Sequence, residues 1–149
     1  MTNSRLTIAS ILMLSLFALP ACDKTATTDS VAQFEAELSP KSEVPPIVGD
    51  ADGEAEIKID QATNKLTWKI EYEDLTGNVT DAHFHGPAMI GEKAGVALQI
   101  EGDLSSPIKG EATLTAAQTA DLLAGRWYVN LHTAAHPDGE IRGQLVPKS

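Results

Sequence analysis

The sequence has a single cysteine and a shortage of basic residues, and each shortage excludes a class of protein. Cys22 has no second cysteine with which to form an internal disulfide. Eleven lysines and arginines against 21 aspartates and glutamates give a formal net charge of −10 at pH 7. Binding to phosphate backbones needs a basic patch, so we expect no nucleic acid among the partners. The sequence also lacks an internal repeat, a glycine-rich phosphate loop and a nucleophile elbow.

The N-terminal residues 1–21 predict an export signal. One basic residue precedes an apolar run over residues 6–19, which is too short to cross a bilayer. Residues 19–22 read Leu-Pro-Ala-Cys and resemble the lipobox of bacterial lipoproteins. On this interpretation Cys22 becomes the lipidated first residue of the mature chain, and the polar residues 22–33 form a flexible tether. We therefore expect a lipid-anchored protein of the cell envelope, periplasmic or on the outer surface; the alternative is an exported protein with an unmodified cysteine.

Short stretches of alternating apolar and polar residues occupy most of the chain after the tether. Alternation of this kind predicts half-buried strands of antiparallel sheet. The clearest pair, 54–60 and 66–73, predicts a hairpin that turns at residues 62–65. Further strands are predicted at 34–38, 80–86, 96–100, 108–114, 127–133 and 139–146, with Val96, Leu98 and Ile100 as the inward set of one of them. Seven or eight short strands with turns between them predict an all-β protein, an antiparallel β-sandwich or barrel.

One short helix is predicted near residues 116–124. Thr115 and Gln118 match a capping box, and Gly125 suits the end of the helix. The helix is expected to cover one end of the sheets with an apolar stripe formed by Ala116, Ala120, Leu123 and Ala124.

Three of the four histidines lie on the predicted outward faces of two strands. His83 and His85 are two residues apart, so they share one face while Phe84 points to the core. His132 lies on the outward face of the strand 127–133, and His136 follows in the next loop. If the two strands are neighbours, three or four imidazoles converge on one point.

Converging neutral imidazoles are typical of a copper or zinc site. Asn130 is expected to be a hydrogen-bond partner inside the cluster, and Glu140 and Asp138 to complete or support it. Arg142, two residues after Glu140, either forms a surface ion pair with it or holds it toward the histidines. The alternatives are histidines that only hydrogen-bond to loop backbones, or a site for a ligand other than a metal. Trp68 and Trp127 are expected to fill the core.

Four segments of the chain resemble the CHRD domain, a family first noticed in chordin. They are residues 43–46, 82–88, 122–125 and 127–145. The resemblance extends over nearly the whole mature chain, which makes residues 34–149 one domain. It implies an immunoglobulin-like, Greek-key β-barrel distantly related to copper/zinc superoxide dismutases, and no settled biochemical activity. His83, His85 and His132 fall on positions of the family motif, whereas His136 does not.

Three functions follow as hypotheses. The first is a membrane-tethered binding module with one copper or zinc ion. The second is a metal-dependent redox enzyme of the superoxide dismutase type, although four histidines allow one mononuclear site and not the two metal centres of such enzymes. The third is a protein-interaction module without metal. Binding is favoured over catalysis.

Overall fold

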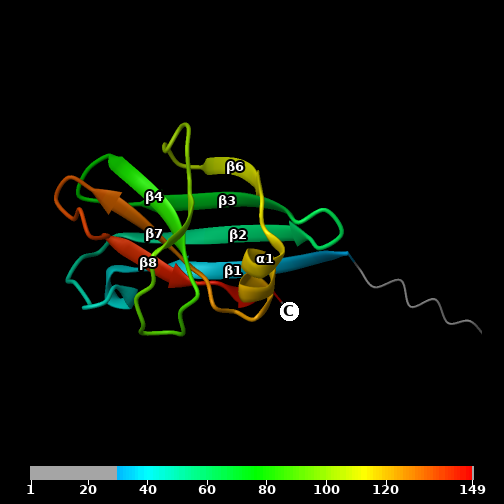
Figure 1. Ribbon diagram of the computed structural model, residues 1–149. Coiled ribbons are helices and arrows are strands. Elements are labelled where there is room, and N and C mark those ends of the chain that lie inside the picture. The colour runs from blue at the N-terminus through cyan, green and yellow to red at the C-terminus, as the bar shows by residue number, and fades with distance from the viewer. Residues whose placement is uncertain (1–29, 149) are drawn as a thin grey trace, which may run out of the picture.

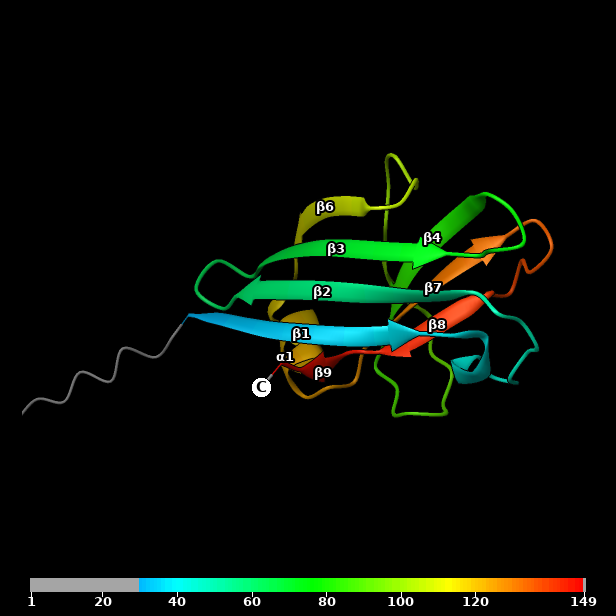
Figure 2. The ribbon, with the colours of Figure 1, turned by 180° about the vertical axis from the view of Figure 1, so that it is seen from behind.

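The computed structural model describes residues 30–148, which form two packed antiparallel sheets (Figures 1 and 2). One sheet has the strand order β6-β3-β2-β1-β9 and the other β5-β4-β7-β8. The predicted sandwich is therefore confirmed, and the sheets do not close into a barrel. The elements are β1 Val31–Leu38, η1 Pro40–Ser42, β2 Asp52–Asp60, β3 Lys65–Glu73, β4 Val79–His85, β5 Val96–Gln99, β6 Ile108–Thr113, α1 Ala116–Leu123, β7 Tyr128–Thr133, β8 Ile141–Gln144 and β9 Val146–Pro147.

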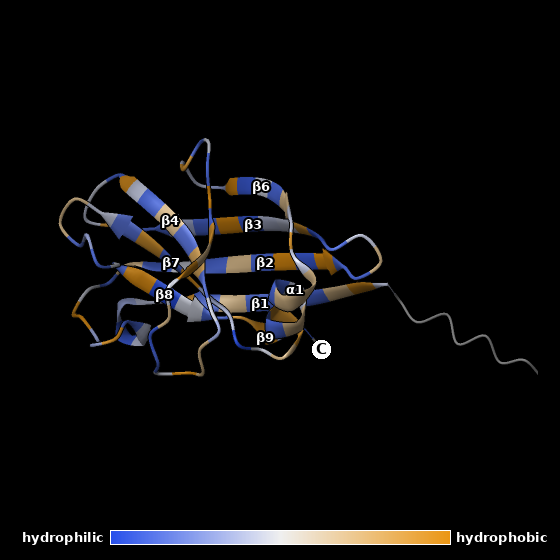
Figure 3. Ribbon diagram, in the orientation of Figure 1, coloured by the Kyte–Doolittle hydropathy of each residue, from blue (hydrophilic) through white to orange (hydrophobic). Residues whose placement is uncertain are grey.

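The five-stranded sheet contains the predicted hairpin. β2 and β3 pair along their full lengths, from Asp52 opposite Glu73 to Asp60 opposite Lys65. Side chains alternate across this sheet, with the apolar set buried and the charged set exposed, as the colours along the strands show (Figure 3). One buried and one solvated face is the usual arrangement for an antiparallel sheet.

Aromatic side chains join the two sheets in the core. Trp68 of β3 meets Phe84 of β4 edge to face, with the ring centroids 5.5 Å apart. Trp127 lies 6.0 Å from the same Phe84 ring, and both tryptophans are buried. The expectation that they fill the core is confirmed. Because Phe84 is held from two sides, its neighbours His83 and His85 must point away from the core.

Three expectations about the edges of the fold were wrong. The proline-rich segment after β1 contains the short helix η1 and is not wholly extended. Val96 is 55% exposed, because β5 is an edge strand that reaches the core only at its C-terminal end, near the buried Ile100. β1 begins at Val31, so the last residues assigned to the tether pair with β2.

The predicted capping box of α1 is present, and the helix ends before Gly125, which has a φ of 70°. The predicted stripe was wrong, because Thr119 and Leu122 are the residues that α1 buries. The buried face of this two-turn helix is therefore shifted by one residue from the predicted stripe, from Ala120 and Leu123 to Thr119 and Leu122. Figures 1 and 2 place α1 at the end of the sandwich where β1 begins.

Within residues 30–148, no helix is long and apolar enough to span a bilayer. The predicted signal peptide, the lipidation site Cys22 and most of the tether lie outside these described residues.

Candidate metal centre

Neighbouring strands bring three histidines together. β4 and β7 are antiparallel neighbours, with His83 opposite Asn130 and Asp81 opposite His132. His83, His85 and His132 each offer a ring nitrogen, and these atoms all lie within 4.8 Å of one another. The sequence predicted that the imidazoles converge if these two strands are neighbours, and the pairing of β4 with β7 meets this condition.

The ring of His132 is fixed by a backbone carbonyl. Its Nδ1 lies 2.9 Å from the carbonyl oxygen of Pro137, in the loop after β7. A carbonyl oxygen only accepts, so Nδ1 carries the proton and Nε2 of the neutral ring holds a lone pair. That Nε2 lies 3.0 Å from Nδ1 of His83.

His85 is anchored in the same way by the loop after β4. Its Nδ1 donates to the carbonyl oxygen of Ala94 at 3.0 Å, which leaves the lone pair on Nε2. This Nε2 is buried and has no hydrogen-bond partner. The ring stacks on Tyr128, with centroids 4.8 Å apart and an angle of 4° between the planes. His85 thus holds an unpartnered acceptor in a ring that cannot easily turn.

Burial favours the neutral forms of His83 and His85. Desolvation is the main cause that lowers the pKa of His83, and the nearby His132 and His85 lower it further. Desolvation also lowers the pKa of His85, although the hydrogen bond to the Ala94 carbonyl and the polar side chain of Asn130 act in the opposite direction. Neutral imidazole is the form that binds metals.

These features fit a transition-metal ion. With metal–nitrogen bonds of about 2.0–2.1 Å, two nitrogens on one ion lie about 3 Å apart, which agrees with the 3.0 Å between His83 and His132. The 4.8 Å limit for the whole group is slightly wider than the about 4 Å that two opposite bonds span. Metal-bound histidines usually donate their other N–H to a carbonyl or carboxylate, as His85 and His132 do here.

The residues expected to support the cluster divide into two groups. Asn130 is inside it, with Oδ1 3.1 Å from Nε2 of His132. Glu140 and Arg142 are both buried and form no ion pair among the described residues, so both expectations for that pair were wrong. Loops that the sequence pattern could not place cover this face and give each residue another partner.

Glu140 binds the loop after β3. Its carboxylate accepts from the backbone N–H of Thr76 at 2.7 Å and from two hydroxyl groups, those of Thr76 at 2.8 Å and Thr133 at 2.6 Å. Burial opposes ionisation, but these hydrogen bonds outweigh it and hold the pKa of Glu140 below its ordinary value. Glu140 is therefore a structural carboxylate next to the cluster.

Arg142 fixes the loop between β4 and β5. Its guanidinium donates to the carbonyl oxygen of Glu92 at 2.6 Å and lies 3.5 Å from the centre of the Tyr128 ring. Tyr128 in turn stacks on His85, so the three side chains form one continuous stack. This stack limits the movement of the His85 ring.

His136 is not among the three grouped histidines. It lies with Asp138 and Lys93 around a small hollow of about 260 Å³ beside the cluster, which Glu43 also lines. Glu43 is the residue that the sequence pattern missed, because it lies in the proline-rich loop, where no periodicity marks a face. It is 7% exposed, and one of its carboxyl oxygens has no hydrogen-bond partner.

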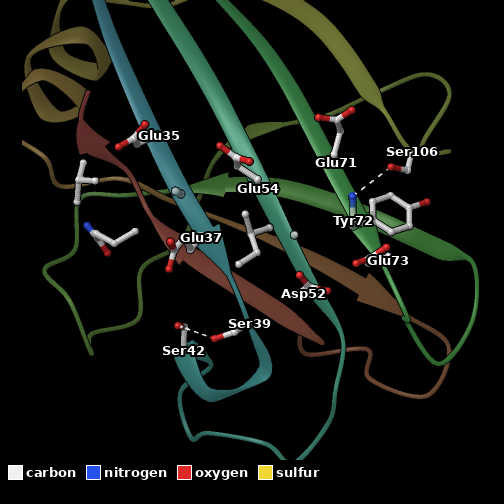
Figure 4. A pocket seen from close by; sticks show the side chains of 15 residues that line it. Glu35, Glu37, Ser39, Ser42, Asp52, Glu54, Glu71, Tyr72, Glu73 and Ser106 are labelled. Atoms are coloured by element: carbon white, nitrogen blue, oxygen red, sulfur yellow. Dashed lines mark hydrogen bonds between the residues drawn. The ribbon is translucent and has the colours of Figure 1, made fainter. Parts of the chain in front are cut away.

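A larger hollow, of about 970 Å³, is elsewhere, on the five-stranded sheet (Figure 4). Glutamates from three adjacent strands line it, and Glu37, Glu54 and Glu71 face one another across the strands. Exposed carboxylates on a sheet surface are common without a ligand, and none of the three grouped histidines lines this hollow.

Among known families, the CHRD domain matches residues 34–145. No curated protein and no solved structure matches the chain.

Proposed function

Because the chain belongs to the CHRD domain family, which supports a role in binding, we propose that it is a binding module holding one copper or zinc ion. The ligands are His83, His85 and His132. The observation that carries the proposal is the buried Nε2 of His85, an acceptor without a partner, on a ring that is grouped with those of His83 and His132.

The choice of metal follows from the ligand type. Imidazole suits both zinc and copper, and the general order of affinities for divalent ions places Cu²⁺ above Zn²⁺. No cysteine is available to a site in the domain, since the only one is Cys22. The proposed site therefore differs from cysteine thiolate sites, which favour Cu(I).

We also propose that the module is tethered to a membrane of the cell envelope through Cys22. The lipobox-like segment and the polar residues after it support this proposal. A single acyl chain binds a membrane only marginally, so a stable anchor needs two or more chains.

The test is the metal content of untagged protein, followed by zinc and Cu²⁺ titration of the metal-free form. We expect about one ion per chain and a thermal stabilisation that grows with metal concentration, about 2.7 kcal/mol at one hundred times Kd. The double variant His83→Ala/His85→Ala should lose uptake, and His136→Ala is the matched control that should keep it. If the double variant binds as well as the control, or if the natural protein takes up no metal, the proposal is wrong.

The same protein separates the competing functions. A superoxide assay before and after copper loading tests the dismutase hypothesis. A folded protein that takes up neither zinc nor copper favours the metal-free interaction module.

A further inference from the structure

Asn130 lies against the lone pairs of the histidine cluster. It projects from the middle of β7 and is 4% exposed. Its Oδ1 is 3.1 Å from Nε2 of His132, and that same nitrogen is 3.0 Å from Nδ1 of His83. Three polar atoms from three side chains therefore converge on one small volume.

The protonation of His132 excludes a hydrogen bond between two of these atoms. Nδ1 of the neutral ring donates to the carbonyl oxygen of Pro137, so Nε2 has no proton to give. Oδ1 of Asn130 also only accepts. Two acceptors at 3.1 Å repel each other unless a cation or a second ring proton lies between them.

Glu43 determines which end of the Asn130 amide faces the histidines. Oxygen and nitrogen of an amide are distinguished by their hydrogen-bond partners. Nδ2 of Asn130 lies on the side of Glu43 Oε1, so the NH₂ group points away from the cluster. Close packing keeps both groups there, because a Cβ atom at Gly139 would lie 2.6 Å from Glu43 Oε1 and 2.7 Å from Asn130 Nδ2.

We propose that Oδ1 of Asn130 is the fourth donor to the ion held by the three histidines, and that Glu43 is the positioning residue that aims it. This inference rests on the proposed metal site. Three imidazoles and one amide oxygen complete the four-coordinate shell that zinc prefers in structural sites. A closed shell leaves no position for a substrate, so the ion links β4 and β7 and does not act as a catalyst.

The test loads Co²⁺, as a coloured substitute for zinc, into the full chain and adds azide. A protein with a filled fourth position should show no azide-induced change in its visible spectrum. Asn130→Ala should show one, because water replaces Oδ1 and azide displaces it. We expect Asn130→Ala to bind zinc about ten- to a hundredfold more weakly, as for other residues that orient or complete a site.

Further variants keep the result independent of folding defects. Asn130→Asp retains an oxygen at the same position, so it should bind zinc at least as tightly as the natural protein and resist azide. Glu43→Gln retains an acceptor for the amide and should also resist azide, whereas Glu43→Ala should become sensitive. Asn78→Ala, at an exposed asparagine, is the control that should behave as the natural protein.

The outcomes separate the two proposals. If the natural protein binds Co²⁺ and responds to azide as strongly as Asn130→Ala, the fourth-donor assignment is wrong and the three-histidine site stands. If the natural protein binds neither Co²⁺ nor zinc, both proposals fail, and a proton on His132 accounts for the short contact to Asn130.

Discussion

Replacing Gly86 by alanine should destabilise the domain. This glycine directly follows β4 and lies against the buried indole of Trp127. A Cβ atom at Gly86 would lie 2.4 Å from Cδ1 and 2.8 Å from Nε1 of Trp127. It would also lie 2.9 Å from the carbonyl oxygen of Arg126. Ordinary contacts of this kind begin at 3.4 Å, so the ring or the strand would have to shift by about 1 Å.

Neither group can shift freely. Trp127 is 1% exposed and packs on Phe84, which is itself fully buried. Overpacking a closed core costs about 1–3 kcal/mol, and contact with both a ring and a backbone oxygen places this variant near the middle of that range. We expect a loss of about 2 kcal/mol, which for a domain of this size lowers the Tm by about 8 °C.

The assay is urea unfolding of Gly86→Ala and of Gly95→Ala, a matched control in the same loop. A Cβ atom at Gly95 would meet nothing within 4 Å, and its backbone is not left-handed. Gly95→Ala should therefore lie within about 0.5 kcal/mol of the natural protein or be slightly more stable. Equal stability of the two variants would refute the reasoning, because it would mean that Trp127 is not closely packed against Gly86.

Three further predictions concern charge and anchoring. The pKa of Glu140 is lowered in the folded state, so its contribution to stability should be lost as the pH falls below its ordinary value of 4.5; Glu140→Gln should reduce this acid sensitivity in unfolding curves recorded at several pH values, and an unchanged pH dependence would contradict the assignment. The pKa values of His83 and His85 are also lowered. The folded protein therefore binds fewer protons than the unfolded chain just below pH 6.5, and metal-free stability should fall as the pH drops through that region. The same titration of the His83→Ala/His85→Ala variant should show a smaller fall, and an equal fall would assign it to other groups. Finally, Cys22→Ser should release the protein from membranes and abolish labelling by radioactive fatty acid in a bacterial host, whereas labelling that survives the substitution would rule out this cysteine as the anchor.

Local signals in the sequence predicted the secondary structure well where one face is buried and the other is solvated. The β2–β3 hairpin and the capping box of α1 are examples, because alternation and capping depend on residues close in the chain. The stripe of α1 was wrong because alanine fits a buried and an exposed position equally well. The prediction that Val96 faces the core was wrong, because an apolar pattern does not show that a strand lies at the edge of a sheet.

The candidate site shows the same division. The spacing of His83 and His85 placed both rings on one face, and alternation placed His132 and Asn130 on the outward face of their strand. The pattern predicted solvent on that face, whereas every residue of β7 is buried. The reason is that the loops after β4 and β7 fold back over it, and loops carry no periodicity from which their position could be read.

The sequence by itself determined the strands, the core aromatics, the acidic surface and the types of ligand available, because each depends on composition or on neighbours along the chain. Only the tertiary structure decided that β4 and β7 are adjacent, that carbonyl oxygens of two loops orient His85 and His132, and that Glu43 faces Asn130. These contacts join residues from separate strands and loops. Their geometry follows from how the two sheets pack and how the loops close, which no local pattern encodes.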